Sequence, residues 1–393
     1  MSVVKLGSGG TFAGEVTLPG SKSLSNRLLL LAALAEGETR LRGLLDSDDV
    51  AHLRRALLDL GVLLELESDT WVVRPRSLNQ QADLFLGNAG TAFRPLTAVL
   101  AATPGDFILR GQPRMHERPI GPLVEALRLW GAEIEYLGEP GYPPLRIRGR
   151  KLSGGVTRVD GSISSQFVSA LLMATPLLTA PSTIEVVGEL VSQPYIDLTI
   201  RQMAQFGVAV QRVNPRCYQV GQGSYRSPGD LWVEGDATAA SYFLAAGAIA
   251  GGPVRVFGAG RNSQQGEIRF AQVLGQMGAQ VTWGDNWVEL AAPAHGARLQ
   301  GVSCDLNDIP DSAMTLAMVA LFAQGPSEIR GVANWKVKEC DRQQALHDEL
   351  LKLGARVELL PDGLRVSPPQ TWKSARIATY DDHRMAMCFS LAA

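Results

Sequence analysis

The stretch SNRLLLLAALAEG, at 25–37, is apolar on almost every side and ends in a glycine. Five further runs of this kind follow at intervals of roughly 70 residues, and a repeat of that length marks one supersecondary unit copied several times. They read TAFRPLTAVLAATPG (91–105), SQFVSALLMATPLL (165–178), TAASYFLAAGAIAGG (238–252), DSAMTLAMVALFAQG (311–325) and DHRMAMCFSLAA (382–393). A helix without a polar face is buried inside a domain, so each run is predicted to be an inner helix.

A second, amphipathic helix is expected between successive inner helices. In the second copy, residues 119–130 place Leu123, Leu127 and Trp130 on one stripe. The following Gly131 suits a left-handed helix end, and the other complete copies share this apolar-glycine ending. Strand-like segments surround both helices, so each copy is predicted to be a β-α-β-α-β-β unit. The sixth copy is expected to be incomplete, because the sequence stops at Ala393 after its inner helix.

Symmetry indicates the domain organisation. Three copies could close around a common helix bundle, so six copies predict two domains of three. The candidate crossings between these domains lie at 18–21 and 234–236. The N-terminal segment, 3–21, precedes the first inner helix and is expected to complete a sheet of the later half.

Composition excludes several classes of protein. The chain of 393 residues is 46% hydrophobic and 19% charged, with a net charge of −2, which is typical of a globular protein and not of a nucleic-acid or membrane-surface binder. The first residues resemble no targeting signal, and no apolar run is long enough to span a membrane. The cysteines are far apart and are predicted to be free thiols in the cytoplasm, without a metal site: Cys217, Cys304, Cys340 and Cys388.

Small and polar residues gather where the inner helices start. Helix N-termini present unpaired N–H groups, which makes them anion sites, although helix capping alone also favours such residues. Capping does not require the cations Lys22, Arg27, Arg94 and Arg384, which lie at these starts. The segments are PGSKSLSNR (19–27), GNAGTAFRP (87–95), DGSISSQ (160–166), EGDATAAS (234–241), DIPDSAM (308–314) and YDDHRMAM (380–387).

Two further segments add cations, namely RMHERP (114–119) and NWKVKECDR (334–342). Either segment alone is typical of a solvated face. However, arginine suits the bidentate binding of carboxylate or phosphate. Arg118, Lys338 and Arg342 bring the number of cations to seven, which indicates substrates with several negative charges.

These segments, taken in order across 19–387, resemble the signatures of the 5-enolpyruvylshikimate-3-phosphate synthase family. The resemblance implies a two-lobed inside-out α/β barrel of six βαβαββ repeats, three in each lobe. It implies one lobe of residues 21–235 and another of 1–20 with 236–393. The implied reaction transfers the enolpyruvyl group of phosphoenolpyruvate to the 5-hydroxyl of shikimate 3-phosphate and releases phosphate, within the shikimate pathway. The resemblance further implies no metal and no organic cofactor, a monomer, and inhibition by glyphosate.

The resemblance also implies a role for each matching residue. Asp311 would be the base on the 5-hydroxyl, Glu339 the acid for the methylene carbon, and Lys22 would contact both ligands. The residues implied for shikimate 3-phosphate are Lys22, Ser23, Arg27, Ser164, Ser165, Gln166, Ser192, Tyr195, Asp311, Asn334 and Lys338. Those implied for phosphoenolpyruvate are Lys22, Asn88, Gly90, Arg118, Gln166, Arg342, His383 and Arg384.

The chain departs from the family pattern in a few places. Phe93, Lys336 and Cys340 replace residues that are usual there, and none of these positions is an implied ligand. After the sixth inner helix the family continues with a strand, a lysine-bearing segment and an outer helix. Without them we expect an exposed apolar groove, a weaker second lobe and weaker binding of phosphoenolpyruvate.

Two alternatives remain open at this point. The first is a weakly active or non-catalytic form that still binds shikimate 3-phosphate. The second is the related enolpyruvyl transferase acting on UDP-N-acetylglucosamine. That enzyme carries a reactive cysteine in a mobile loop, and the corresponding GQPRMHERP (111–119) has none.

Overall fold

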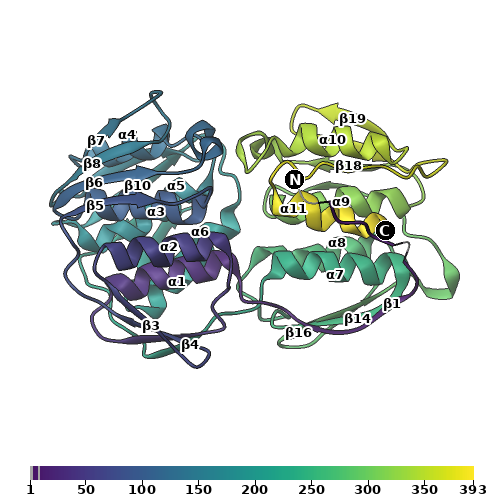
Figure 1. The fold of residues 1–393 in the computed structure, drawn as a ribbon, viewed down its shortest axis with the longest axis horizontal. Helices are drawn as coiled ribbons and strands as arrows, with labels where there is room; N and C mark the ends of the chain where they lie inside the picture. The colour runs from purple at the N-terminus through teal and green to yellow at the C-terminus, as the bar shows by residue number, and fades with distance from the viewer. Residues whose placement is uncertain (1–2, 8) are drawn as a thin grey trace. The chain divides into compact units, whose positions relative to one another are not determined.

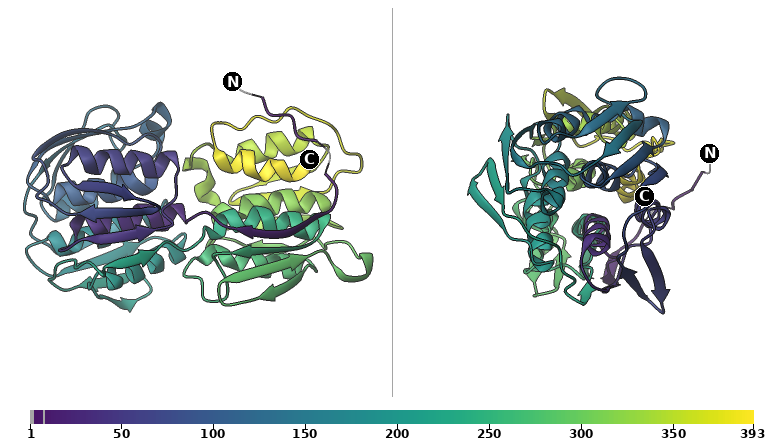
Figure 2. Two further views of the ribbon diagram at one scale, coloured as in Figure 1. Left: turned by 60° about the horizontal axis from the view of Figure 1, so that its bottom comes forward. Right: turned by 90° about the vertical axis from the view of Figure 1, so that its left-hand side faces the viewer.

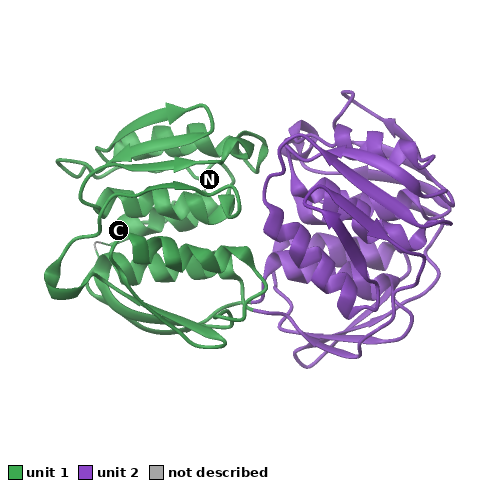
Figure 3. Cartoon of the chain, turned by 180° about the vertical axis from the view of Figure 1, so that it is seen from behind, with its two compact units in different colours: residues 1–19, 235–393 green, residues 20–234 purple. Residues whose placement is uncertain are grey.

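The computed structural model describes residues 3–7 and 9–393. The chain forms two compact units, one of residues 20–234 and one of residues 1–19 with 235–393 (Figure 3). Part of the predicted lobe 1–20, namely residues 1–2 and 8, lies outside the described residues. The predicted α/β class is confirmed, since small mixed sheets alternate with inner and outer helices along the chain (Figure 1).

All of residues 20–234 are described, and they form three inner helices, three outer helices and three four-stranded sheets. The inner helices are α1 (Lys22–Leu34), α3 (Gly90–Ala101) and α5 (Ser165–Ala174), and the outer ones are α2 (Asp48–Asp59), α4 (Gly121–Leu129) and α6 (Gln193–Gln205). The strands are β2 (Thr39–Arg42), β3 (Leu63–Glu67), β4 (Thr70–Arg74), β5 (Gln81–Phe85), β6 (Gly105–Arg110), β7 (Glu133–Tyr136), β8 (Leu145–Gly149), β9 (Gly155–Asp160), β10 (Ser182–Val187), β11 (Val210–Asn214), β12 (Cys217–Val220) and β13 (Asp230–Trp232). Short 3-10 turns are η1 (Pro113–Glu117) and η2 (Thr175–Leu177).

The three sheets repeat one topology. Their spatial orders are β13-β2-β4-β3, β5-β6-β8-β7 and β9-β10-β12-β11. In each sheet the first pair is parallel and the other two pairs are antiparallel. The first sheet takes its leading strand, β13, from the far end of the unit, where Leu231 pairs with Leu41. The unit is therefore closed by its own last strand.

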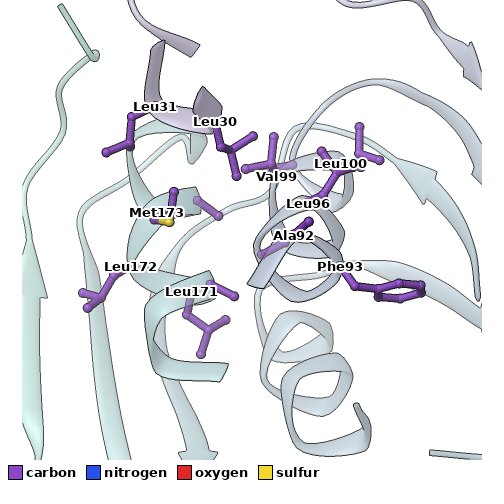
Figure 4. Packing of buried hydrophobic residues seen from close by; sticks show 14 of the residues in the cluster. Leu30, Leu31, Ala92, Phe93, Leu96, Val99, Leu100, Leu171, Leu172 and Met173 are labelled. Carbon is purple, nitrogen blue, oxygen red and sulfur yellow. The ribbon is translucent and has the colours of Figure 1, made fainter. Parts of the chain in front are cut away.

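The inner helices form the core of this unit. Leu28 to Leu31 in α1 are all buried, because this helix is apolar on every side. Side chains from α1, α3 and α5 meet in the centre, among them Leu30, Leu96 and Met173 (Figure 4). The sheets lie around the helices, at the periphery of the unit (Figure 2). The predicted inner helices are thus confirmed for the first three copies.

The outer helix α4 begins at Gly121, and not at residue 119 as the pattern predicted. Pro122 lies in its first turn, where backbone N–H groups have no partner within the helix, so proline costs no hydrogen bond there. The predicted stripe is correct, since Leu123, Leu127 and Trp130 are buried.

The other unit contains the last three copies. Its described residues, 3–7, 9–19 and 235–393, form two four-stranded sheets and five α-helices. The helices are α7 (Ala237–Ala250), α8 (Phe270–Gln276), α9 (Pro310–Val319), α10 (Arg342–Lys352) and α11 (His383–Phe389). The strands are β1 (Phe12–Thr17), β14 (Gly251–Phe257), β15 (Gln280–Trp283), β16 (Trp287–Ala291), β17 (Ser303–Asp305), β18 (Ser327–Arg330), β19 (Arg356–Leu360) and β20 (Gly363–Ser367). The 3-10 turns are η3 (Gly266–Arg269), η4 (Ala294–Gly296), η5 (Ala320–Phe322), η6 (Ala333–Val337) and η7 (Ser390–Ala392).

The N-terminal segment completes a sheet of the later half, as predicted. The spatial orders are β1-β14-β16-β15 and β17-β18-β20-β19, and β1 pairs in parallel with β14. The strand covers only Phe12–Thr17 of the predicted 3–21. The sixth inner helix is also shorter than the run 382–393 predicted, because its last residues form the 3-10 turn η7, a common way for an α-helix to end.

Glycines stand at both predicted crossings because the backbone packs closely there. A Cβ atom on Gly20 would lie 1.9 Å from the carbonyl oxygen of Gly43. A Cβ atom on Gly235 would lie 2.9 Å from the carbonyl carbon of Gly258. Any side chain at either position would force the backbone apart.

Candidate functional site

In the unit 20–234, most of the predicted site residues lie at or near the starts of α1, α3, α5 and α6, and Arg118 directly follows η1. Lys22 is the first residue of α1, and its Nζ lies 3.1 Å from Oδ2 of Asp49 in the first turn of α2. The sequence analysis missed Asp49. Acidic residues in the first turn of a helix are common for electrostatic reasons alone, so the sequence offers no signal that this one pairs with Lys22.

Arg27 joins α1 to α6. Its side chain is buried, and its Nε donates a hydrogen bond of 2.8 Å to Oγ1 of Thr199. Its Nη1 donates to the backbone oxygen of Ser23 at 3.0 Å, and its Nη2 to that of Tyr195 at 3.4 Å. Three of the predicted residues are therefore neighbours, and buried Ser192, with a left-handed φ of 56°, directly precedes α6 in the same region.

Gly90 lies against two guanidinium groups. Arg118 donates from Nη1 to the backbone oxygen and to Oδ1 of Asn88, at 2.7 and 2.9 Å. A Cβ atom on Gly90 would lie 2.4 Å from Nη1 of Arg94, 2.9 Å from Nη2 of Arg118 and 3.1 Å from Oε1 of Gln166. The structure thus brings together four of the predicted residues, namely Asn88, Gly90, Arg118 and Gln166.

Arg94 was noted in the sequence as a cation at a helix start but was not assigned to the site. It is buried, its Nη2 donates to the backbone oxygen of Pro119 at 3.1 Å, and its guanidinium lies 5.9 Å from the ring centre of Phe167. Its position beside Gly90 adds a second positive charge to this cluster.

The start of α5 carries three predicted residues in sequence. Ser164 is the N-cap, and its Oγ accepts a hydrogen bond of 3.2 Å from the backbone N–H of Gln166. Ser165 is buried at the first helical position. A helix N-terminus that carries hydroxyl groups is suited to a phosphate.

In the other unit, Asp311 is the centre of a largely buried group of charges. Its Oδ1 lies 2.9 Å from Nη1 of Arg342 and 3.4 Å from Nζ of Lys338, and its Oδ2 lies 2.9 Å from Nη2 of Arg384. Burial by itself would raise the pKa of Asp311, but the charges of Arg384, Lys338 and Arg342 hold it well below its usual range. Asp311 is therefore a carboxylate at neutral pH.

Arg342 is held by carboxylates on three sides. Besides Asp311, its Nη2 lies 2.8 Å from Oε2 of Glu339 and its Nε lies 2.8 Å from Oδ2 of Asp382. Burial lowers the pKa of Arg342, and the charges of Asp382, Glu339 and Asp311 together raise it above its ordinary value. The predicted base and the predicted acid thus share one guanidinium.

Asp382 is a second residue that the sequence analysis missed. It is the N-cap of α11, and its Oδ1 accepts a hydrogen bond of 2.9 Å from the backbone N–H of Arg384. Burial would raise the pKa of Asp382, but Arg342 lowers it. From the sequence, an aspartate at this position is accounted for by helix capping alone. Only the fold shows that Asp382 also orients Arg342.

The surrounding groups complete this cluster. The thiol of Cys340 donates to Oδ2 of Asp382 at 3.5 Å, and burial raises the pKa of Cys340 to about 12, so it stays protonated. Arg384 donates from Nη1 to the hydroxyl of Tyr242 at 3.5 Å. Nδ1 of His383 lies 3.7 Å from Oδ1 of Asp382, and Asn334 is buried in η6. In this unit the predicted residues Asp311, Lys338, Glu339, Arg342 and Arg384 therefore form one group of charges.

Two further observations bear on ligands and membranes. Within 3–7 and 9–393, histidine, cysteine, aspartate and glutamate nowhere gather in a group of three or more that could hold a metal ion. Among the same residues no helix has both the length and the apolar character needed to cross a membrane.

Comparison with known proteins identifies the family. The family model described as EPSP synthase (3-phosphoshikimate 1-carboxyvinyltransferase) matches residues 7–393. The 3-phosphoshikimate 1-carboxyvinyltransferase of Bordetella pertussis is 56% identical in an alignment of 393 positions, which covers 97% of this chain and 89% of that protein. The protein of the same name from Laribacter hongkongensis is 56% identical, with coverage of 100% and 93%.

Solved structures agree with this result. The structure of EPSP synthase from Acinetobacter baumannii superposes with a TM-score of 0.78 at 27% sequence identity. The match covers 98% of this chain and 90% of that one. The enolpyruvyl transferase NikO from Streptomyces tendae shares the fold at 18% identity and a TM-score of 0.70, with coverage of 98% and 88%. The chain belongs to the EPSP synthase family, the 3-phosphoshikimate 1-carboxyvinyltransferases.

Proposed function

We propose which residues of this chain carry out the reaction of its family, the transfer of the enolpyruvyl group of phosphoenolpyruvate to shikimate 3-phosphate. The oxygen of the 5-hydroxyl adds to C2 of phosphoenolpyruvate while C3 gains a proton. Loss of that C3 proton and of phosphate then restores the double bond. The reaction needs a base for the hydroxyl and an acid for C3.

Asp311 is the proposed base and Glu339 the proposed acid. The observation that carries this assignment is the shared guanidinium of Arg342, which lies 2.9 Å from Asp311 and 2.8 Å from Glu339. One buried cation thereby holds both carboxyl groups in fixed positions.

Substrate binding would make Asp311 a better base. Three cations now hold its pKa low, and a weakly basic carboxylate is a poor proton acceptor. The carboxylate and phosphate of phosphoenolpyruvate compete for Arg342 and Arg384, so their binding would draw these cations away from Asp311. The pKa of Asp311 would then rise when the substrate is present.

The cations supply the proposed binding sites. In the unit 20–234, the hydroxyl-rich start of α5 and the buried Arg27 would hold shikimate 3-phosphate, with Ser23, Ser192 and Tyr195 nearby. Asn334 and Lys338 of the other unit would assist. For phosphoenolpyruvate we assign Lys22, Asn88, Gly90, Arg118, Gln166, Arg342, His383 and Arg384.

The two units themselves would be the two functional lobes, and the chain would act as a monomer in the cytoplasm. Free cysteines are typical of a reducing compartment. Glyphosate, an anion, would occupy the phosphoenolpyruvate site beside Gly90, where Arg94 and Arg118 converge.

A phosphate-release assay tests the proposal. The chain should release phosphate only when shikimate 3-phosphate and phosphoenolpyruvate are both supplied, and EDTA should leave the rate unchanged. Release from phosphoenolpyruvate alone, or loss of the rate on chelation, would contradict the assigned chemistry.

A further inference from the structure

Two consecutive left-handed residues precede α11. Tyr380 has a φ of 53° and Asp381 a φ of 54°, and neither is a glycine. Residues other than glycine rarely adopt this backbone conformation, and it persists only where surrounding contacts hold it. The next residue is Asp382, which orients Arg342 and caps the helix that carries Arg384.

The contacts that hold this segment converge on Glu349. Its carboxylate, on α10, is completely buried. Oε2 accepts a hydrogen bond of 3.1 Å from the backbone N–H of Ala378, and Oε1 accepts one of 2.8 Å from the hydroxyl of Tyr380. Lys352 donates to both oxygens, at 2.7 and 2.6 Å, so each oxygen has two donors and the buried charge is balanced.

This arrangement ties α10 to the segment at two places. Arg342, in the first turn of α10, binds Asp382, and Glu349, two turns later, binds Ala378 and Tyr380. Within the segment, the backbone N–H of Asp382 donates to the oxygen of Thr379 at 2.9 Å. The position of Asp382 relative to Arg342 is therefore set by the hydrogen bonds of Glu349 as well as by its own.

We propose that Glu349 is a positioning residue for phosphoenolpyruvate, because it fixes residues 378–381 against α10 and so places Asp382 and Arg384. The proposal rests on the proposed role of Arg342 and Arg384 in binding this substrate. Burial raises the pKa of the Tyr380 hydroxyl to about 12, which keeps it a hydrogen-bond donor throughout the working range. Glutamine at position 349 has one acceptor oxygen and would place an amide N–H₂ against Lys352, so it could not accept all four hydrogen bonds.

The test is steady-state kinetics of the Glu349→Gln variant of the whole chain, well below its melting temperature. We expect the KM for phosphoenolpyruvate to rise about 10-fold or more, since small displacements of binding groups have effects of this size. The KM for shikimate 3-phosphate should change by less than about 2-fold, because most of its proposed contacts lie in residues 20–234. Tyr380→Phe removes a single donor and should shift the same constant in the same direction by a smaller factor.

Leu274→Ala is the matched control for stability. Leu274 is buried in α8 of the same unit, and this helix packs mainly on α7, η3 and β15. This variant should melt at a lower temperature while both KM values stay near those of the parent. If Glu349→Gln behaves like Leu274→Ala, the residue is only structural and the proposal is wrong.

Arg342→Ala distinguishes the role of Arg342 in binding phosphoenolpyruvate from the positioning role of Glu349. If it leaves the KM for phosphoenolpyruvate unchanged, the assignment of Arg342 fails and the positioning role falls with it. If it raises that constant while Glu349→Gln and Tyr380→Phe do not, only the positioning role is overturned. If Glu349→Gln does not fold, Tyr380→Phe is the test. A rise in the KM for phosphoenolpyruvate alone supports the positioning role, and an unchanged KM overturns it.

Discussion

Gly90 shows how one missing side chain defines a ligand space. The first residue of α3 lies beside the guanidinium groups of Arg94 and Arg118, where a methyl group would be 2.4 and 2.9 Å from their nitrogens. Contacts under 3 Å cannot persist, so Gly90→Ala must displace at least one arginine. We expect the inhibitory concentration of glyphosate to rise at least about 10-fold, with a smaller rise in the KM for phosphoenolpyruvate.

An inhibition assay compares this variant with Gly221→Ala, which lies in the same unit and has open space around its Cβ position. The control should match the parent. An unchanged inhibitory concentration in Gly90→Ala would place the glyphosate site elsewhere.

Each of the two carboxyl groups that share Arg342 is expected to be needed for catalysis. Asp311→Asn and Glu339→Gln should each lower kcat by about 10²–10⁴-fold, the usual contribution of a general base or acid. Binding of shikimate 3-phosphate, measured by calorimetry, should change little. Asp308→Asn is the control, since Asp308 lies directly before α9, close to Asp311 in the sequence, but pairs with Arg269. Near-normal turnover in either variant would refute its assigned role.

At the scale of the element, Asp382 links the start of α11 to α10, and this link should respond to acid. The pKa values of Asp311 and Asp382 are below their unfolded value of about 3.9. Groups shifted in this direction stabilise the fold fully above the unfolded pKa, and the stabilisation is lost as the pH falls through the folded values. The unit of residues 1–19 and 235–393 should therefore lose stability steeply below about pH 4.

Asp382→Asn tests this dependence. The variant should be less stable at pH 7 by roughly 3 kcal/mol, because it breaks a buried ion pair. Its melting temperature should fall less between pH 5 and pH 3, since asparagine does not titrate. Glu328→Gln, in a partly exposed pair with Arg330, should change stability by about 1 kcal/mol or less. A parallel acid response in Asp382→Asn and the parent would contradict the assignment.

The elements also show how far the sequence predicts the structure. Periodicity identified the six inner helices and placed their starts close to the observed ones, because an all-apolar helix between polar caps is a strong local signal. It placed the start of α4 two residues early and extended the last inner helix to residue 393, since local composition defines helix ends poorly. Asp49 and Asp382 were missed because their partners, Lys22 and Arg342, are distant in sequence. In addition, an aspartate at the start of a helix is already explained by capping or by the helix dipole, so the sequence gives no sign of an ion pair.

At the scale of the whole molecule, each compact unit has its own core. One hydrophobic cluster lies entirely within residues 20–234, and the other within residues 1–19 and 235–393. The ends of the unit 20–234 meet, because the backbone N–H of Ser21 donates to the oxygen of Glu234 at 2.8 Å. A unit with a separate core and adjacent ends should be able to fold alone.

We therefore expect the fragment 20–234 to unfold in urea as a single cooperative transition, whereas the shorter fragment 20–227 should be markedly less stable. The shorter fragment lacks β13, whose residues Asp230–Trp232 pair with β2, and it lacks buried Val233. Without β13, the backbone groups of β2 on that side are left without strand partners, and an unpaired edge favours aggregation. Circular dichroism and size-exclusion chromatography of both fragments measure this difference. Equal stability of the two fragments would show that β13 does not close the unit, and an unfolded 20–234 would show that its core depends on the rest of the chain.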